Sequence, residues 1–140
     1  MKEITHVTAK VRTNPYLRGM FEQLLLHGVG DYLTQTSWMA MNKKNKGLNG
    51  FLACIIHCSI YALPFMLIGS PLAVLVIFLT HFAIDRSHLI ERYIALINRG
   101  DPKVNFGYPA DRPIFLTLWL YIVVDNMFHL LCNYAALSLL

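Results

Sequence analysis

The sequence predicts an all-α protein, a four-helix transmembrane bundle that forms a single domain over residues 1–140. Hydrophobic residues make up 56% of the chain and charged residues only 14%, against about a quarter in soluble domains. The apolar residues form three long stretches, 51–69, 71–84 and 113–140, in which Asp125 is the only charged residue. A membrane span needs roughly 20 mostly apolar residues, so the first and third stretches suffice alone. A soluble helical bundle is the alternative.

Turn and cap residues divide the chain into its expected elements. Residues 1–15 form a polar arm without the apolar run of a signal peptide. Pro15 suits a first helical turn, a lysine-rich turn covers 42–50, and Pro64 should kink the second helix. A Gly-Ser-Pro turn precedes the third helix, and a loop with three prolines precedes the fourth. The expected helices cover about 16–41, 51–68, 71–98 and 113–140.

Loop charges predict the orientation of the chain in its membrane. Lysine and arginine residues concentrate in the turn at 42–50 and around the loop at 99–112, whereas the turn between the second and third helices has none. Cytoplasmic loops carry the excess of such residues, so both basic loops should be cytoplasmic and the C-terminus on the far side. Attraction to the membrane surface accounts for the net charge of +4, so no nucleic-acid partner is expected.

The first helix is harder to place than the other three. If it spans the membrane, the four basic residues in and before its first turns (Lys2, Lys10, Arg12 and Arg18) lie on the far side. Loop charge therefore favours a re-entrant or interfacial first helix. The depth of its polar residues, considered next, favours a span.

Each predicted helix carries ionisable residues inside an apolar segment. Three histidine–aspartate pairs have i,i+4 spacing on different helices, and the second helix adds a histidine: His27 and Asp31, His57, His81 and Asp85, Asp125 and His129. An i,i+4 pair projects both side chains into the same space, as a helix does when it offers two ligands to one metal. A lone charge at the bilayer centre costs about 2.5–3.5 kcal/mol, and a bound cation would offset that cost.

A helical rise of about 1.5 Å per residue places these groups at similar depths if the first helix spans. Gln35, His57 and Asp85 would lie about 6–9 Å from the cytoplasmic edge. His81, Asp31 and Asp125 would lie about 12–18 Å in, and His27 and His129 near 21–24 Å, by the same rise. The polar side chains are thus expected to converge inside the bundle.

The residue types favour a divalent metal. Imidazole and carboxylate ligands together suit Zn, Mn, Fe or Ni. The expected ligands are His27, Asp31, His57, His81, Asp85 and His129. Asp125 would be a further ligand or the general base, and Gln35 would orient substrate or water. These residues suffice for one metal or for two, and two metals about 3.5–4 Å apart would clamp a phosphoester.

Other interpretations of the same residues stay open. A single His–Asp pair is more often a hydrogen-bonded contact within a helix, and a proton relay uses the same residue types. Gln35 could join two helices instead of binding substrate. Cys54 and Cys58 are interpreted as buried packing residues, and His88 and Glu91 as solvated groups near the membrane edge.

Four segments carry a resemblance to a known family: LLLHGVGDYLTQTSWMAMNKK, HCSIYAL, THFAIDRSHL and VVDNMFHLL. Together, over residues 24–131, the chain resembles a family of small bacterial and phage integral membrane proteins of unknown function. Asn126 stands where that family often has glutamine, and His88 lies where a lysine is common. The layout is more loosely similar to bacterial inner-membrane proteins described as membrane-bound metal-dependent hydrolases, which implies a hydrolase.

Three functions are therefore expected. The first is a metal-dependent hydrolase with an intramembrane site, acting on a lipid-like or phosphoester substrate such as a polyprenyl phosphate. The alternative is a non-enzymatic phage or bacterial membrane protein that binds a host partner or alters the envelope. There the His/Asp set would be a structural metal site or a polar network. The third is a proton or metal-ion conduit. The bilayer is the expected partner in each case, with a homo-oligomer or a membrane protein as further candidates.

Overall fold

The structure is a computed structural model that describes residues 15–140. Within that part of the chain every regular element is helical and no strand occurs, so the predicted all-α class is confirmed. The expected polar arm lies outside the described residues except for Pro15, where the first described helix begins. The expected four-helix transmembrane bundle is not confirmed: in the described part of the chain two of the expected helices are broken, and two or three candidate membrane spans occur.

The first expected helix is interrupted before Ser37. Helix α2 (Pro15–Gly28) continues into the π-helical segment η1 (Val29–Leu33), a bend follows, and α3 (Ser37–Asn42) begins anew. The Thr34 hydroxyl donates to the carbonyl of Gly30 at 2.9 Å, and Thr36 caps α3 by accepting from the backbone N–H of Met39 at 3.3 Å. Side-chain hydrogen bonds to the local backbone compete with helix continuation in this way.

The second expected helix forms with a tightened end. Helix α4 (Gly47–Ala62) continues into the 3-10 segment η2 (Leu63–Leu67), which contains Pro64. The third expected helix is split into α5 (Pro71–Arg86) and α6 (Leu89–Asn98), which are inclined at 64°. The guanidinium of Arg86 donates to the carbonyls of Lys43 and Asn45, which ties the end of α5 to the turn before α4.

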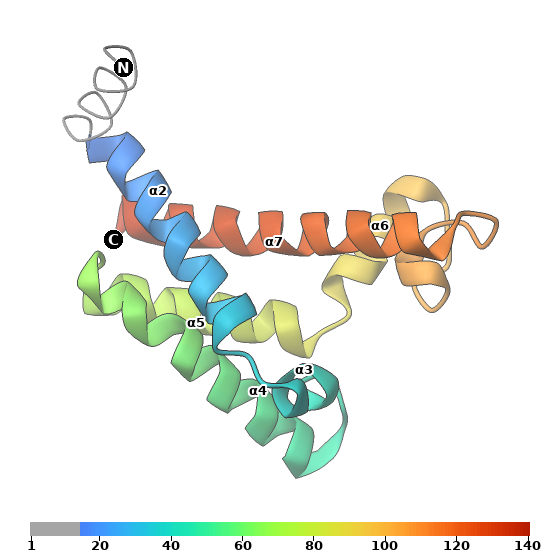
Figure 1. Ribbon diagram of the computed structural model, residues 1–140, viewed down its shortest axis with the longest axis horizontal. Helices are drawn as coiled ribbons and strands as arrows, with labels where there is room; N and C mark the ends of the chain where they lie inside the picture. Colours follow the sequence, from blue (N-terminus) through green and yellow to red (C-terminus); the bar gives the residue numbers. More distant parts are fainter. Residues whose placement is uncertain (1–14) are drawn as a thin grey trace.

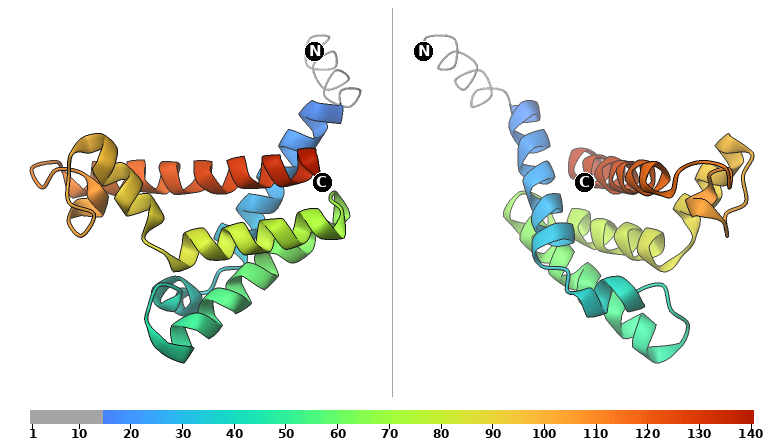
Figure 2. Two further views of the ribbon diagram at one scale, coloured as in Figure 1. Left: turned by 180° about the vertical axis from the view of Figure 1, so that it is seen from behind. Right: turned by 45° about the vertical axis from the view of Figure 1, so that its right-hand side comes forward.

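The last helix is the longest. The loop after α6 contains the short 3-10 segment η3 (Asn105–Gly107) and leads to α7 (Ile114–Leu139). Figures 1 and 2 show α5 and α7 side by side and antiparallel, with α4 and α2 crossing them obliquely. The basic loops lie toward one end of this arrangement, and η2 and the C-terminus lie at the other (Figure 1).

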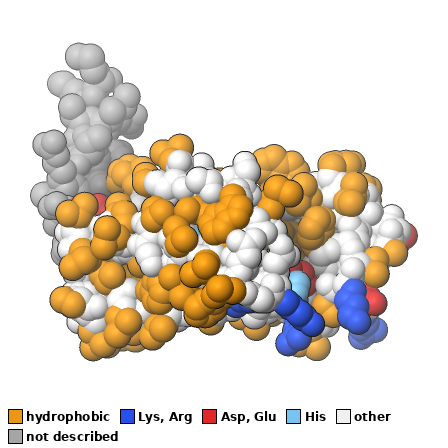
Figure 3. Space-filling model, turned by 90° about the horizontal axis from the view of Figure 1, so that it is seen from below, with side chains coloured by type: hydrophobic (Ala, Val, Ile, Leu, Met, Phe, Trp, Pro, Cys, Tyr) orange, Lys and Arg blue, Asp and Glu red, His pale blue; other side chains and the backbone are white. Residues whose placement is uncertain are grey.

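Two helical segments of the described chain are long and apolar enough to cross a membrane: Gly47–Leu67 and Ile114–Leu139. A third candidate span results if α5 and α6 are counted as one bent element. Figure 3 shows hydrophobic side chains over most of one face, while basic side chains gather toward the end where α6 lies. So many exposed large hydrophobic side chains are typical of a protein that contacts lipid. These features indicate a membrane protein.

Two apolar clusters enclose a polar layer. One cluster centres on Tyr61, Phe65 and Ile77, and the other on Ile84 and Ile90. The polar layer lies between them, because along α5 the buried His81 stands between Ile77 and Ile84. The fold therefore places ionisable groups between two apolar layers, where an unbalanced charge is costly.

Candidate metal centre

Four helical elements bring the predicted polar residues together. The contributing side chains are Asp31 from η1, His57 from α4, His81 and Asp85 from α5, and Asp125 and His129 from α7. Each predicted i,i+4 pair is in contact: His27 with Asp31 at 3.3 Å, His81 with Asp85 at 3.2 Å, and His129 with Asp125 at 3.7 Å. The π-helical segment at Asp31 also fits, because such bulges occur frequently at functional sites.

The centre of the cluster is a pair of imidazoles flanked by carboxylates. The Nε2 atoms of His57 and His81 are 3.0 Å apart. Asp31 Oδ1 lies 3.2 and 3.5 Å from these two atoms, and Asp85 Oδ2 lies 3.1 and 3.2 Å from them. Ligand atoms around a tetrahedral zinc ion at about 2.0–2.1 Å lie about 3.3–3.4 Å from one another. The spacing of the donor atoms thus fits a metal's coordination shell.

The described residues offer three groups whose ligand atoms all lie within 4.8 Å of one another: Asp31, His57 and His81; Asp85, Asp125 and His129; and Cys58, His81 and Asp85. The first two groups share no residue. They are in contact, because Nε2 of His81 in the first group lies 3.2 Å from Oδ2 of Asp85 in the second. The arrangement therefore has room for one ion or for two adjacent ions. Cys58, which the sequence suggested only as packing, is a further candidate ligand.

Burial differs across the cluster. His57, His81 and His129 are almost fully buried, whereas the side chains of Asp31 and Asp125 are 11% and 24% exposed. The Nδ1 atoms of those three histidines have no hydrogen-bond partner among the described residues. In most metal sites the far ring nitrogen donates to a carboxylate or carbonyl, so this centre departs from the usual pattern.

Lys43 reaches the same cluster from the turn before α4. Its Nζ lies 2.9 Å from Asp85 Oδ2. Burial disfavours the charged amine, but the neighbouring Asp85 carboxylate outweighs this effect and raises the pKa of Lys43 above its usual value. Gln35 contacts this lysine instead of an imidazole: its amide oxygen accepts from Nζ at 3.1 Å, and its nitrogen donates to the Asp31 carbonyl at 3.2 Å.

The charges of the cluster do not balance. The carboxylates of Asp31, Asp85 and Asp125 face one ammonium group, that of Lys43, which leaves a formal charge of −2 when the histidines are neutral. A charge of this size between apolar layers requires a counter-ion or the uptake of protons by the imidazoles or the carboxylates. One divalent cation would neutralise it.

His27 lies beside the cluster but belongs to none of the three groups. Its Nδ1 is 2.8 Å from the hydroxyl of Tyr61, and its Nε2 is 2.7 Å from Oδ1 of Asn126. The Tyr61 hydroxyl also accepts from Asn133 at 2.6 Å. Both ring nitrogens of His27 are therefore engaged in hydrogen bonds, which suits a residue that orients Asp31 better than a direct ligand.

Tyr61 and Asn133 were not expected from the sequence. The ring of Tyr61 stacks on His81 with centroids 3.7 Å apart, and His81 stacks on His129 at 4.0 Å. Tyr61 follows His57 by four residues, and Asn133 follows His129 by four. The spacing that identified the His–Asp pairs would have found both residues if neutral polar side chains had been included.

The sequence that carries these residues matches one known protein family. Residues 20–139 match the model of a family described as Protein of unknown function (DUF3307). The chain belongs to the DUF3307 family. This match confirms the resemblance to a family of unknown function. The matched range also includes every residue of the His/Asp cluster. No curated protein and no solved structure matches the chain.

A second polar cluster of this DUF3307 chain lies toward the basic end. Lys44 Nζ donates to Glu91 Oε1 at 2.7 Å and to the Tyr121 hydroxyl at 2.9 Å. His88 Nδ1 lies 3.5 Å from the same Glu91 oxygen. Glu91 is buried, although the sequence suggested a solvated group, because α6 bends back over the start of α7.

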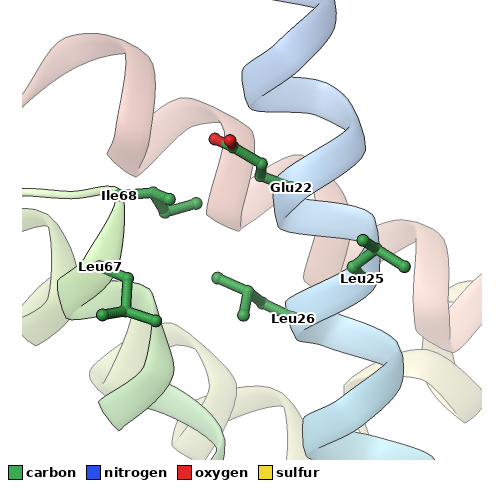
Figure 4. A pocket seen from close by; sticks show the side chains of 5 residues that line it. All are labelled: Glu22, Leu25, Leu26, Leu67 and Ile68. Atoms are coloured by element: carbon green, nitrogen blue, oxygen red, sulfur yellow. The ribbon is translucent and has the colours of Figure 1, made fainter.

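An apolar pocket of about 460 Å³ lies at the opposite end of the molecule, between α2 and η2. Figure 4 shows Glu22 and Leu26 of α2 facing Leu67 and Ile68 across it. No residue of the His/Asp cluster lines this pocket.

Proposed function

We propose that this DUF3307 chain is an integral membrane protein with an intramembrane divalent-metal centre, and that it hydrolyses a lipid-like or phosphoester substrate. The observation that carries the proposal is that the Nε2 atoms of His57 and His81 lie 3.0 Å apart and that one oxygen each of Asp31 and Asp85 lies 3.1–3.5 Å from both of them. The metal would be Zn, Mn, Fe or Ni. His129 and Asp125 would complete the site or hold a second ion.

The formal charge of −2 supports the same conclusion. Ordinary hydrogen-bonded networks in apolar surroundings are close to neutral, because an unpaired charge there is expensive. This cluster has more carboxylates than lysines. A divalent cation explains the excess without requiring protonated imidazoles.

A metal at this position would polarise a phosphoryl oxygen and lower the pKa of a bound water to about 7. The protein's own groups would supply the remaining functions. Asp125 is the most exposed carboxylate of the cluster and stands 3.7 Å from His129, so it is the general base that we propose. Lys43 would attract an anionic substrate oxygen, and Gln35 would hold that lysine in place.

For the topology, we propose a multi-pass protein of a bacterial inner membrane with the loops at 42–50 and 99–112 in the cytoplasm and the C-terminus on the far side. The Pro15 end of α2 lies at the same end of the molecule as the C-terminus of α7 (Figure 1). This direction supports a tilted span over a re-entrant first helix. The exposed apolar side chains of α7 leave room for lipid, a second copy or another membrane protein.

The ion pair between Lys43 and Asp85 favours a second candidate function. A lysine ammonium can itself be the cation that a buried carboxylate needs, as in a structural polar network. The chain would then be a non-enzymatic membrane protein that binds a partner or alters the envelope. A proton or metal-ion conduit, the third expectation, would use the same buried groups.

Metal analysis of the purified full chain tests the proposal. We expect at least one divalent ion per chain, loss of that ion in His81→Ala and Asp85→Ala, and full retention in His88→Ala, which changes an exposed histidine outside the cluster. Phosphate release from a lipid phosphomonoester in mixed micelles should follow the metal content. Absence of stoichiometric metal would overturn the metal centre. Metal without hydrolysis would leave a structural site, and ion flux into vesicles would favour the conduit.

A further inference from the structure

A second pocket lies at the basic end of the molecule, apart from the His/Asp cluster. Its volume is about 480 Å³, within the usual range of small-molecule sites. Helix α6, the loop after it, η3 and the first residue of α7 form its walls. The lining residues are His88, Glu91, Arg92, Pro102, Lys103, Asn105, Phe106 and Ile114. Because the candidate span of α7 begins at Ile114, the pocket lies at the level of a membrane surface.

The pocket combines basic groups with one buried carboxylate. Arg92 and Lys103 are exposed basic residues on its walls, and His88 adds an ionisable ring. Glu91 is only 9% exposed, and Lys44 contacts its Oε1. Its other oxygen, Oε2, is buried and has no partner among the described residues. Such an acceptor is costly unless a donor reaches it.

The walls of the pocket have a fixed shape. Asn105, Phe106 and Gly107 all have positive φ, at 48°, 60° and 91°. A Cβ at Gly107 would collide with the backbone oxygen of Glu91, so this turn packs directly on α6. The Asn105 side chain donates to the carbonyls of Pro109 and Arg112 and accepts from the hydroxyl of Thr117 at 2.6 Å. These contacts hold the turn that forms one wall of the pocket in a defined conformation.

We propose that this pocket binds the phosphoethanolamine headgroup of a membrane phospholipid. The phosphate would lie against Arg92 and Lys103. The primary ammonium would donate to the Glu91 carboxylate, whose Oε2 would turn toward the pocket to accept. The apolar side chains of Pro102, Phe106 and Ile114 would contact the glycerol region. A headgroup of this kind supplies both an anion and an N–H donor, which matches the two chemistries of the pocket. The proposal is independent of the metal centre, since the two sites share no residue.

A comparison of two lipids isolates the role of Glu91. Phosphocholine has the same net charge and the same phosphate as phosphoethanolamine, but its quaternary nitrogen has no N–H to donate. Charge-assisted hydrogen bonds contribute about tenfold in binding. The pocket should therefore prefer phosphatidylethanolamine over phosphatidylcholine with the same acyl chains by about tenfold.

The experiment is native mass spectrometry of the detergent-purified full chain with an equimolar mixture of the two lipids. Glu91→Gln should reduce the preference to near equality while the lipids still bind. The double variant Arg92→Gln with Lys103→Gln should weaken the binding of both lipids several-fold and keep the preference. Arg112→Gln removes an exposed charge from the same loop without lining the pocket, so it should change neither quantity.

Three outcomes would overturn the proposal. The first is equal binding of the two lipids by the unmodified chain, and the second is an unchanged preference in Glu91→Gln. The third is displacement of the lipid by soluble phosphoethanolamine at similar concentration, which would assign the pocket to a soluble phosphoester. Glu91→Gln could fail to fold, because Lys44 loses its partner. In that case the double variant tests the pocket, because Arg92 and Lys103 are exposed and their replacement should not affect folding. Unchanged binding of both lipids by the double variant would then overturn the proposal.

Discussion

The Nε2 atoms of His57 and His81 lie 3.0 Å apart although the residues are 24 positions apart in sequence. Two protonated nitrogens cannot face each other at this distance, so the pair shares either one proton or one cation. Carboxylate oxygens of Asp31 and Asp85 lie within 3.5 Å of both atoms. Negative groups around two facing lone pairs favour a positive charge between them, which the proposed metal ion would supply. This contact is the feature on which the proposed metal centre depends most directly.

Metal should stabilise the folded chain. A ligand that binds only the folded state adds about 2.7 kcal/mol of stability at 100 times its Kd. We expect the thermal midpoint in detergent to fall after dialysis against a chelator and to recover when a divalent ion is restored. His57→Gln should abolish the recovery, because it removes a central donor, and His88→Gln should retain it. An equal response of both variants to the metal would contradict a site at His57.

Removing the hydroxyl of Tyr61 should destabilise the protein without emptying the centre. In Tyr61→Phe the ring can still stack on His81, but His27 and Asn133 lose their shared partner. An unsatisfied buried polar group costs about 1–3 kcal/mol. Thermal unfolding should therefore shift downward while the metal content stays unchanged.

Tyr134→Phe is the matched control for this prediction. It removes a hydroxyl from an exposed tyrosine on α7 and should leave the thermal midpoint unaltered. Loss of metal from Tyr61→Phe would instead show that the hydroxyl acts at the centre itself.

The sequence predicted those parts of the candidate site that depend on contacts between residues close together in the chain. The i,i+4 spacing is a local property of helices, so the convergence of His81 with Asp85 and of Asp125 with His129 could be predicted. Lys43 could not, because its contact with Asp85 depends on how the turn after α3 is held against the end of α5, 42 residues further along the chain. In the sequence it was only one of several basic residues in a turn.

The two helix breaks were missed for different reasons. Residues 34–37 (TQTS) and 85–88 (DRSH) are polar runs that interrupt the apolar pattern, but both helices predicted from the sequence continue across them. In the structure, Thr34 bonds back to Gly30, and Arg86 is anchored on carbonyls of a distant turn. The first contact is local and had a signal in the threonine residues of the polar run. The second joins residues 43 positions apart, and no local pattern predicts it.

Gly30 should not tolerate a side chain. A Cβ at this position would collide with the ring of Tyr61, which is fully buried and stacked on His81. Forcing extra atoms into a packed core typically costs about 1–3 kcal/mol. Gly30→Ala should therefore lower the thermal midpoint and, through the displaced ring, the metal affinity.

Gly28→Ala provides the comparison for Gly30, two residues earlier. No atom lies within 4 Å of a Cβ at Gly28. Alanine has a higher helix propensity than glycine by about 1 kcal/mol, so this variant should be neutral or slightly more stable. Equal effects of the two substitutions would show that the contact between Gly30 and Tyr61 is not a packing constraint.

Replacing Lys43 should lower the stability of the metal-free protein and raise its affinity for a divalent metal. In Lys43→Gln, Asp85 loses its ammonium partner, and the formal charge of the cluster becomes more negative. Breaking a buried pair by removing one partner is destabilising by about 3–5 kcal/mol, and partial exposure of this lysine should reduce that to about 1–3 kcal/mol. A divalent cation should bind the same variant more tightly, because it no longer competes with an ammonium group for Asp85. Chelator-competition titration would measure the Kd, and Lys46→Gln, an exposed lysine of the same turn, should alter neither property. A weaker metal affinity in Lys43→Gln would contradict this competition. It would mean that Lys43 holds Asp85 in place as part of a structural network that supports the metal site.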